Sequence, residues 1–168
     1  MPPGMNIDLA YGQSSLSIDL PSDRTTVIEP SFTSGLPEEK DTLLTALDQP
    51  IGLPALRTMI HPEDRICILF TDITRATPND RIIPWLLEYL SDHPKDQITL
   101  LNQLGTHRPN TREELEAMLT PEVVRNYRVL NHDAEDPDQL VSVGQTASGA
   151  PALLNRQALD ADLRIVTG

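Results

Sequence analysis

The amino-acid sequence predicts an α/β protein: a three-layer, mostly parallel sheet with helices on both faces and an N-terminal β-hairpin extension. The short apolar run at residues 66–70 is typical of a strand that is buried on both faces, and residues 98–101 are expected to form another strand. Helical patterns separate these runs, and a further short strand is expected at residues 127–130. Strands that alternate with helices in this way favour a parallel sheet.

The first thirty residues have a different pattern, which predicts antiparallel structure. Leu16, Ile18 and Leu20 alternate with polar residues, as in a strand with one buried face. The preceding residues 11–13, Tyr-Gly-Gln, are typical of a hairpin turn. Residues 25–28 are predicted to form another short strand.

Helix starts are predicted from capping residues and apolar spacing. Thr77 is expected to cap the most apolar helix, with Pro78 in its first position. Thr111 and Glu114 have the spacing of a capping box. Further helices are expected at residues 37–49, 54–60 and 157–162, and residues 120–122 are expected to open one more helix turn.

The C-terminal part is predicted to end in strands, and this bears on the domain boundaries. Residues 140–143 and 150–154 could pair with each other, and residues 163–166 form a last strand. This strand stops at Gly168, where a loop into a following helix would normally begin. We therefore expect residues 1–4 to be a flexible tail and residues 5–168 to be a single α/β domain that is truncated at its C-terminal end.

Composition narrows the classes of partner. The net charge is −12 and only two of the 13 basic residues are lysines, so no basic patch indicates nucleic-acid binding. No apolar stretch approaches the ~20 residues of a membrane span. The only cysteine, Cys67, lies inside an apolar run and is expected to be a buried packing residue. Its solitary occurrence fits a cytoplasmic location, which we expect.

Three groups of polar residues follow predicted strands and are candidates for a site. Because ligands bind outside the carboxyl ends of strands in open α/β sheets, parallel neighbours would bring these groups to one edge. The groups are Asp72, Thr74 and Arg75; Thr106, His107 and Arg108; and His132 with Asp133.

The residue types indicate possible roles at this edge. Arg75 or Arg108 could hold a carboxylate through paired N–H bonds. His107 could transfer a proton near neutral pH, and Asp72 could orient an imidazole or bind a ribose. The alternative for each is ordinary capping and surface ion pairing, and His132 is better explained as structural. Phosphate-binding glycine loops, a nucleophile elbow and zinc-ligand spacing are missing from the sequence, so no metal ligand is predicted.

Two motifs resemble the N-terminal domain of the lactate racemase family, whose members use a nickel-pincer nucleotide. They are residues 70–78, Phe-Thr-Asp-Ile-Thr-Arg-Ala-Thr-Pro, and residues 105–109, Gly-Thr-His-Arg-Pro. The hairpin at residues 11–13, the Asn-His-Asp of residues 131–133 and the ending at residues 161–168 are also similar to that family. The similarity runs in the same order over nearly the whole chain.

The resemblance implies reversible hydride transfer that interconverts the D and L forms of a small 2-hydroxy acid. It implies that His107 is one of two catalytic histidines and that Arg75 binds the substrate carboxylate. It further implies that Asp72, Thr74 and Arg108 contact the cofactor or support the site.

In the family, the lysine that anchors the cofactor, a nickel-ligating histidine and the second catalytic histidine follow the part that matches this chain. The missing C-terminal part, or a separate chain, is therefore an expected partner, and the 168 residues alone are expected to be inactive. The alternative is a non-catalytic ligand-binding or interaction domain that kept the fold.

Overall fold

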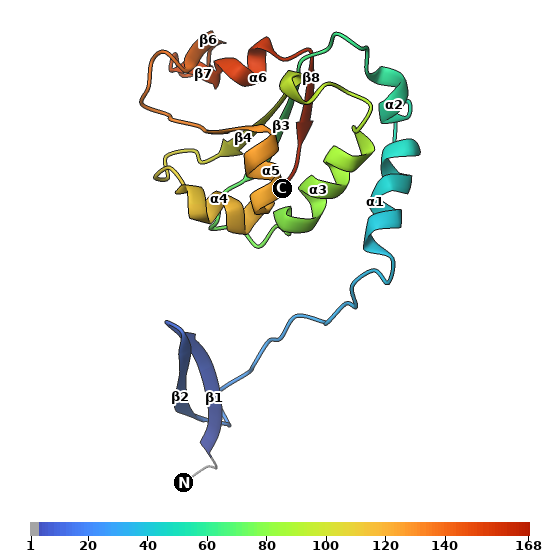
Figure 1. The fold of residues 1–168 in the computed structure, drawn as a ribbon. Helices are drawn as coiled ribbons and strands as arrows, with labels where there is room; N and C mark the ends of the chain where they lie inside the picture. The colour runs from blue at the N-terminus through green and yellow to red at the C-terminus, as the bar shows by residue number, and fades with distance from the viewer. Residues whose placement is uncertain (1–3) are drawn as a thin grey trace. The chain divides into compact units, whose positions relative to one another are not determined.

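The structure is a computed structural model that describes residues 4–168. The chain divides into two compact units, Met1–Gly35 and Leu36–Gly168 (Figure 1). The larger unit contains a four-stranded, fully parallel sheet in the order β5-β4-β3-β8, which confirms the predicted α/β class. Its strands are β3 (Ile66–Thr71), β4 (Ile98–Gln103), β5 (Arg128–Asn131) and β8 (Leu163–Val166).

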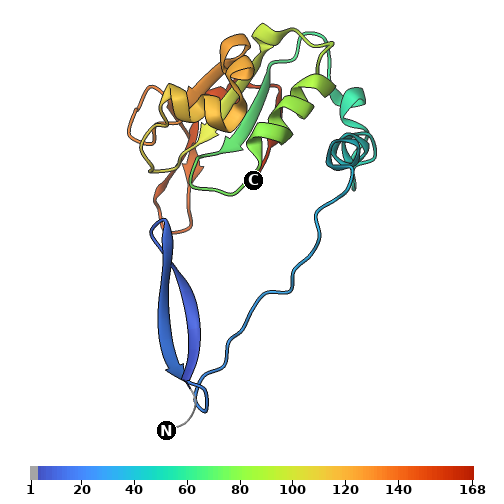
Figure 2. The same cartoon turned by 60° about the horizontal axis from the view of Figure 1, so that its bottom comes forward.

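Helices cover both faces of this sheet, as predicted, but unequally. Ile68, Phe70 and Leu100 point to the larger face and pack against Ile83 and Leu119 of two covering helices. Figure 2 shows α3 and α4 side by side on this face. The helices of the larger unit are α1 (Glu39–Asp48), α2 (Leu56–Met59), α3 (Asn79–Tyr89), the 3₁₀ turn η1 (Lys95–Gln97), α4 (Arg112–Leu119), α5 (Pro121–Asn126) and α6 (Arg156–Asp160).

The opposite face of the sheet is covered by a much smaller cluster. Cys67 and Leu101 point to this side and pack against Ala161 and, in α6, Ala158. Burial raises the pKa of the Cys67 thiol to about 11, so this cysteine is an inert packing residue, as predicted.

Two antiparallel hairpins complete the chain. β6 (Leu140–Gln145) pairs with β7 (Pro151–Asn155), as predicted. In the first unit, β1 (Gly4–Tyr11) pairs with β2 (Ser14–Pro21) across a two-residue turn. Gly12 has a φ of +61° in this turn, a conformation that favours glycine. The predicted N-terminal hairpin is confirmed.

Several local expectations were wrong. Residues 25–28 are not a strand, because Val27 and Ile28 are exposed and no strand among residues 4–168 pairs with them. Pro78 and not Thr77 is the N-cap of α3, which therefore starts at Asn79. The tail expected at residues 1–4 stays a prediction, because residues 1–3 lie outside the described residues; Gly4 is the first residue of β1.

His93, in the loop before β4, is a buried histidine. Its Nε2 lies 2.8 Å from the main-chain oxygen of Asp64. The loops before β3 and β4 pack together at the amino edge of the sheet, and this covers the imidazole.

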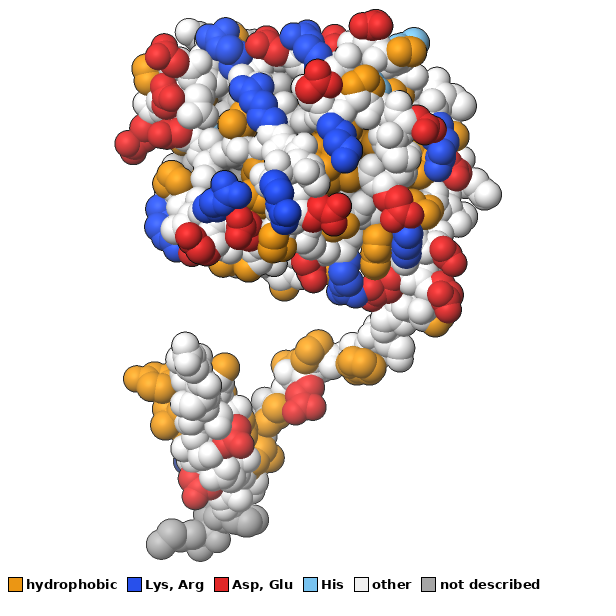
Figure 3. Space-filling view, viewed as in Figure 1, with side chains coloured by type: hydrophobic (Ala, Val, Ile, Leu, Met, Phe, Trp, Pro, Cys, Tyr) orange, Lys and Arg blue, Asp and Glu red, His pale blue; other side chains and the backbone are white. Residues whose placement is uncertain are grey.

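The surface carries charges of both signs. On the face of the larger unit seen in Figure 3, Lys and Arg side chains are interspersed with Asp and Glu. Ion pairs account for part of this pattern, for example Lys40 with Glu88 at 2.7 Å and Arg112 with Glu116 at 2.8 Å. Within residues 4–168, none of the helices has the length and apolarity needed to cross a membrane.

Candidate active site at the carboxyl edge of the sheet

The parallel order of β3, β4 and β5 places the loops that follow these strands at one edge of the sheet, as the sequence predicts. The first loop carries Asp72, the second His107 and the third His132. Register matters here, because Phe70 of β3 pairs with Asn102 of β4, so these two strands end nearly level. Side chains from adjacent loops can therefore reach each other.

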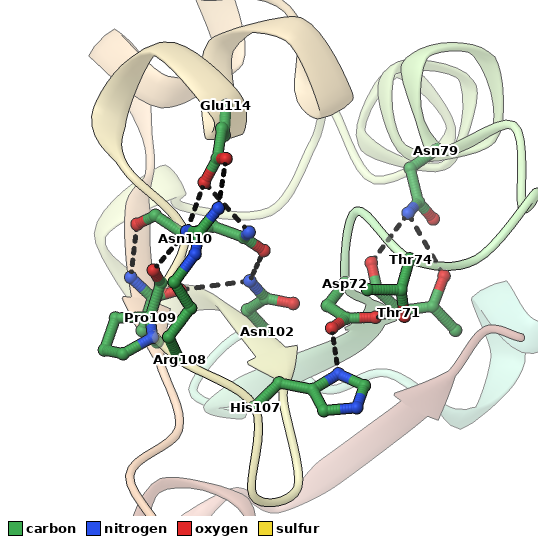
Figure 4. A network of polar contacts seen from close by, with 11 residues as sticks. Thr71, Asp72, Thr74, Asn79, Asn102, His107, Arg108, Pro109, Asn110 and Glu114 are labelled. Carbon is green, nitrogen blue, oxygen red and sulfur yellow. Dashed lines mark hydrogen bonds and ion pairs between the residues drawn. The ribbon is translucent and has the colours of Figure 1, made fainter. Parts of the chain in front are cut away.

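Asp72 and His107 form a short contact across this edge. The Nδ1 of His107 lies 2.6 Å from Oδ2 of Asp72, and the hydroxyl of Thr74 donates to Oδ1 at 2.7 Å (Figure 4). The Asp72 side chain is only 4% exposed, whereas the His107 side chain is 48% exposed. The pair thus joins a buried carboxylate to a ring that solvent or a ligand can reach.

The charge state of Asp72 defines how the ring is protonated. Burial raises the pKa of Asp72, but hydrogen bonds from His107 and Thr74 outweigh it and hold the pKa below its ordinary value. An ionised carboxylate only accepts hydrogen bonds, so Nδ1 of His107 must donate. The neutral ring therefore presents Nε2 as an unprotonated base on its exposed side.

The loop after β3 is built by local bonds that follow from its sequence. The main-chain N–H of Arg75 donates to the main-chain oxygen of Asp72 at 3.1 Å and closes a turn. Asn79, at the start of α3, donates from Nδ2 to the main-chain oxygen of Thr71 at 2.9 Å. The start of α3 is thereby tied to the end of β3, with Asp72 held between them.

Arg75 is the free cation of the site. Its side chain is exposed, and within residues 4–168 its guanidinium has no hydrogen bond or ion pair. It borders a hollow of about 180 Å³ together with Asp72, Asn79 and Met118. The Oδ1 of Asn79 is buried and accepts no hydrogen bond from the described residues. A ligand with anionic and hydroxyl groups would find partners here.

Arg108 lies in a different environment from the one that its position next to His107 suggested. It donates to Glu114 at 2.7 and 2.9 Å and to the main-chain oxygen of Pro109 at 3.0 Å. Figure 4 shows its side chain directed toward Glu114, on the other side of the loop from Asp72. The bonds from Arg108, then from the Thr111 N–H and Asn110, lower the pKa of Glu114 to about 2.

The third loop approaches the second. His107, His132 and Asp133 border one hollow of about 350 Å³, which Arg108 also lines. The Nδ1 of His132 lies 3.0 Å from Nδ2 of Asn155, at the end of β7. This amide holds the His132 ring in place, in agreement with the structural role that the sequence favoured.

Sequence reasoning missed the buried amides beneath these loops. Asn102, Asn110 and Asn131 form a connected network in which Asn102 is 0% exposed. The available signal was an asparagine at the end of an apolar strand, where a hydrophobic residue would otherwise be expected.

The donor atoms of the site also bear on the cofactor that the resemblance implies. Within the described part of the chain, no group of three or more His, Cys, Asp or Glu residues is arranged to hold a metal ion. The unpaired guanidinium of Arg75 fits an anionic group of a nucleotide or acid, and the buried Oδ1 of Asn79 fits a group that donates a hydrogen bond, such as a hydroxyl.

Fold and site together define a class: an open parallel α/β domain with an Asp–His pair and a free arginine at the carboxyl ends of its strands. Residues 11–168 match the family model described as lactate racemase N-terminal domain. The chain belongs to this family.

Named relatives support the assignment. The chain is 30% identical to lactate racemase of Thermoanaerobacterium thermosaccharolyticum over 167 residues, and 32% identical to that of Lactiplantibacillus plantarum over 168 residues. These alignments cover 97% and 91% of this chain but only 39% and 40% of the relatives. The chain thus spans about two fifths of their length and corresponds to their N-terminal part.

Solved structures agree. The lactate racemase apoprotein of T. thermosaccharolyticum matches with a TM-score of 0.80 at 31% identity, over 96% of this chain and 38% of that one. A protein from Thermotoga maritima matches with a TM-score of 0.62 at 21% identity, over 80% of this chain and 34% of that one. The second similarity shows a shared fold.

Proposed function

We propose that this chain is the N-terminal catalytic part of a racemase that interconverts D and L forms of a small 2-hydroxy acid such as lactate. The family membership supports the reaction class. The observation that carries the proposal is the contact between buried Asp72 and half-exposed His107 at 2.6 Å, because it presents an oriented base at a strand end where ligands bind.

His107 would act on the substrate hydroxyl. Its Nε2 removes the proton of the C2 hydroxyl, and the buried carboxylate of Asp72 stabilises the resulting imidazolium. The substrate becomes a 2-oxo acid when its C2 hydrogen leaves as hydride. Hydride can return to either face of the 2-oxo acid. His107 returns the proton to the oxygen for one of the two product forms, and the second catalytic histidine, proposed to lie in the remaining polypeptide, serves the other.

Arg75 would bind the substrate carboxylate. Its guanidinium has no competing partner among the described residues and lies on the same loop as Asp72. Paired N–H bonds to a carboxylate fix both its position and its orientation. Arg75 would thus hold the substrate while His107 handles the proton.

The proposed cofactor is a nickel-pincer nucleotide, which when bound supplies the acceptor and donor of hydride. From this chain, Asp72, Thr74 and Arg108 are the residues proposed to contact it or support its site. Its metal ligands and covalent anchor would come from the remaining polypeptide, so the 168 residues alone are proposed to be inactive. The buried thiol of the only cysteine, Cys67, supports the further proposal of a cytoplasmic location.

The test is substitution of the proposed base in the complete, cofactor-loaded protein. His107→Ala should lower kcat for lactate racemisation by about 10²–10⁴-fold, the usual contribution of a general base, with the fold kept. His61→Ala is the matched control, because His61 is a 79% exposed histidine beside the amino edge of the sheet. Turnover of the His107 variant equal to that of the control would refute the assignment.

The same experiment addresses the alternative, a non-catalytic domain that binds a 2-hydroxy acid. That reading predicts no turnover in the unsubstituted complete protein. It also predicts that lactate affinity depends on Arg75 and not on His107, which equilibrium binding would measure.

A further inference from the structure

The loop that carries His107 is held at both ends by polar groups at the ends of the strands. At its start, the Leu104 N–H donates to the main-chain oxygen of Asn102 at 3.0 Å. At its end, Asn110 accepts two bonds: its Oδ1 from Asn102 Nδ2 at 2.9 Å, and its main-chain oxygen from Asn131 Nδ2 at 2.9 Å. Asn102 therefore contacts both ends of one loop.

The donors and acceptors of this network fix the orientation of each amide group. Asn110 Nδ2 donates to the Glu114 carboxylate at 3.1 Å, so the Oδ1 of Asn110 must face Asn102. Asn131 uses its Nδ2 on a main-chain oxygen, so its Oδ1 also faces Asn102, at 3.0 Å. Two acceptors thus converge on the Nδ2 of Asn102, which supplies a proton to each (Figure 4).

This arrangement has a cost in stability. Asn102 is fully buried, and its Oδ1 accepts no hydrogen bond from any of the described residues. A buried acceptor without a donor is destabilising, and an apolar residue of the same size would avoid that penalty. Such locally unfavourable choices are typical of positions where geometry matters more than stability.

The geometry that depends on the loop is the contact between His107 and Asp72. The loop turns through Gly105, which has a φ of +58°, and through a bond from the His107 N–H to the Leu104 oxygen at 3.0 Å. The sheet fixes the position of His107 by holding the two ends of this loop. A displacement of about 1 Å would break a hydrogen bond of 2.6 Å.

We propose that Asn102 is a positioning residue for the reaction: by holding Asn110 and the end of β5, it fixes the loop so that Nδ1 of His107 meets the carboxylate of Asp72. This inference rests on the proposed role of His107 as the base. A fully buried asparagine would thereby help to decide which ring nitrogen of the exposed His107 carries the proton.

The test combines kinetics with a spectroscopic signal in the complete protein, labelled with ¹⁵N-histidine. Asn102→Leu keeps the number and branching of the side-chain heavy atoms and removes both N–H donors. We expect kcat to fall by about 10–100-fold, with KM changed less than about 3-fold because Arg75 lies on the other loop. The Nδ1 proton resonance of His107, assigned by its loss in His107→Ala, should shift or disappear at temperatures where the variant is folded.

Tyr89→Phe is the control for loss of one buried polar contact. Tyr89 is 5% exposed and donates to Asp48 at 2.6 Å, outside the site, so this variant should lose stability and keep both kcat and the resonance. If Asn102→Leu does not fold, Asn131→Ala removes one arm of the network and should show the same changes in smaller degree.

Folded Asn102→Leu with unchanged kcat and an unchanged resonance would overturn the proposal. The resonance separates the two hypotheses. If the complete protein showed no racemase turnover, the proposed function would fail, whereas the His107 signal would still report whether Asn102 positions the ring.

Discussion

The loops that follow β3 and β4 lie at the same edge of the sheet but are held very differently. In the β4 loop, Arg108 is paired with Glu114, and Asn110 is bonded to two strand ends. In the β3 loop, Asp72 is fixed, but the Arg75 side chain has no partner among residues 4–168. The difference indicates one rigid loop that orients a base and one cation that is left available for an anionic ligand.

The largest effect should come from breaking the contact that joins the two loops. In Asp72→Asn, the Thr74 hydroxyl would still donate to Oδ1, so the new NH₂ group would face Nδ1 of His107. Nδ1 would then become an acceptor and Nε2 would carry the proton, which removes the base. We expect kcat to fall by about 10³-fold in the complete protein, as measured by conversion of L- to D-lactate.

The control for this substitution is Asp92→Asn, an exposed aspartate at the amino edge of the sheet. It should leave turnover unchanged. Retention of more than a tenth of the activity in Asp72→Asn would show that Asp72 does not set the tautomer of His107.

Substitution of the two arginines should have smaller effects, and these effects should differ between Arg75 and Arg108. Arg75→Ala should raise KM for lactate by about 10–100-fold, because a charge-assisted, paired hydrogen bond to the carboxylate is lost. Arg108→Ala should change KM less than about 3-fold and lower the thermal midpoint slightly, because Glu114 loses one of its partners, the ion pair with Arg108.

Initial rates over a range of lactate concentrations measure this contrast directly. Arg75→Lys sharpens it, since a lysine keeps the charge but loses the paired geometry, and its KM should lie between those of wild type and Arg75→Ala. Equal KM values for the Arg75 and Arg108 alanine variants would remove the distinction between the loops.

The smallest effect concerns acid stability. The pKa of Asp72 is lowered below its ordinary value of 3.8, so its stabilising contribution is complete above that pH and is lost as the pH falls through the lower folded value. The thermal midpoint of Asp72→Asn should therefore lie below that of wild type at pH 7, and the gap should narrow below about pH 4. A gap that stays constant down to pH 3 would contradict the pKa shift.

Much of the fold was predictable because it depends on local patterns. The apolar run that became β3 and the last strand, Leu163–Val166, were recognisable from hydrophobicity alone. The capping box of Thr111 and Glu114 was recognisable from spacing and is present in α4. The predicted strand at residues 25–28 failed because a strand needs a partner, and local sequence does not provide one.

The site was only half predictable. That polar strand ends would meet at one edge followed from parallel order, which brought Asp72 and His107 into one region. The environment of Arg108 was not predictable from the sequence. Glu114 was recognisable as a member of the capping box, but not as the ion-pair partner of Arg108. The burial of His93 under a neighbouring loop was likewise invisible in its own sequence neighbourhood.

The sequence by itself determined most of the strands and helices, and which of them end in reactive side chains, because hydrophobic periodicity and capping act over a few residues. Only the tertiary structure decided that Asp72 bonds to His107 and that Asn102 joins Asn110 and Asn131. These partners lie on different strands and loops, and the register of β3, β4 and β5 sets the distances between them.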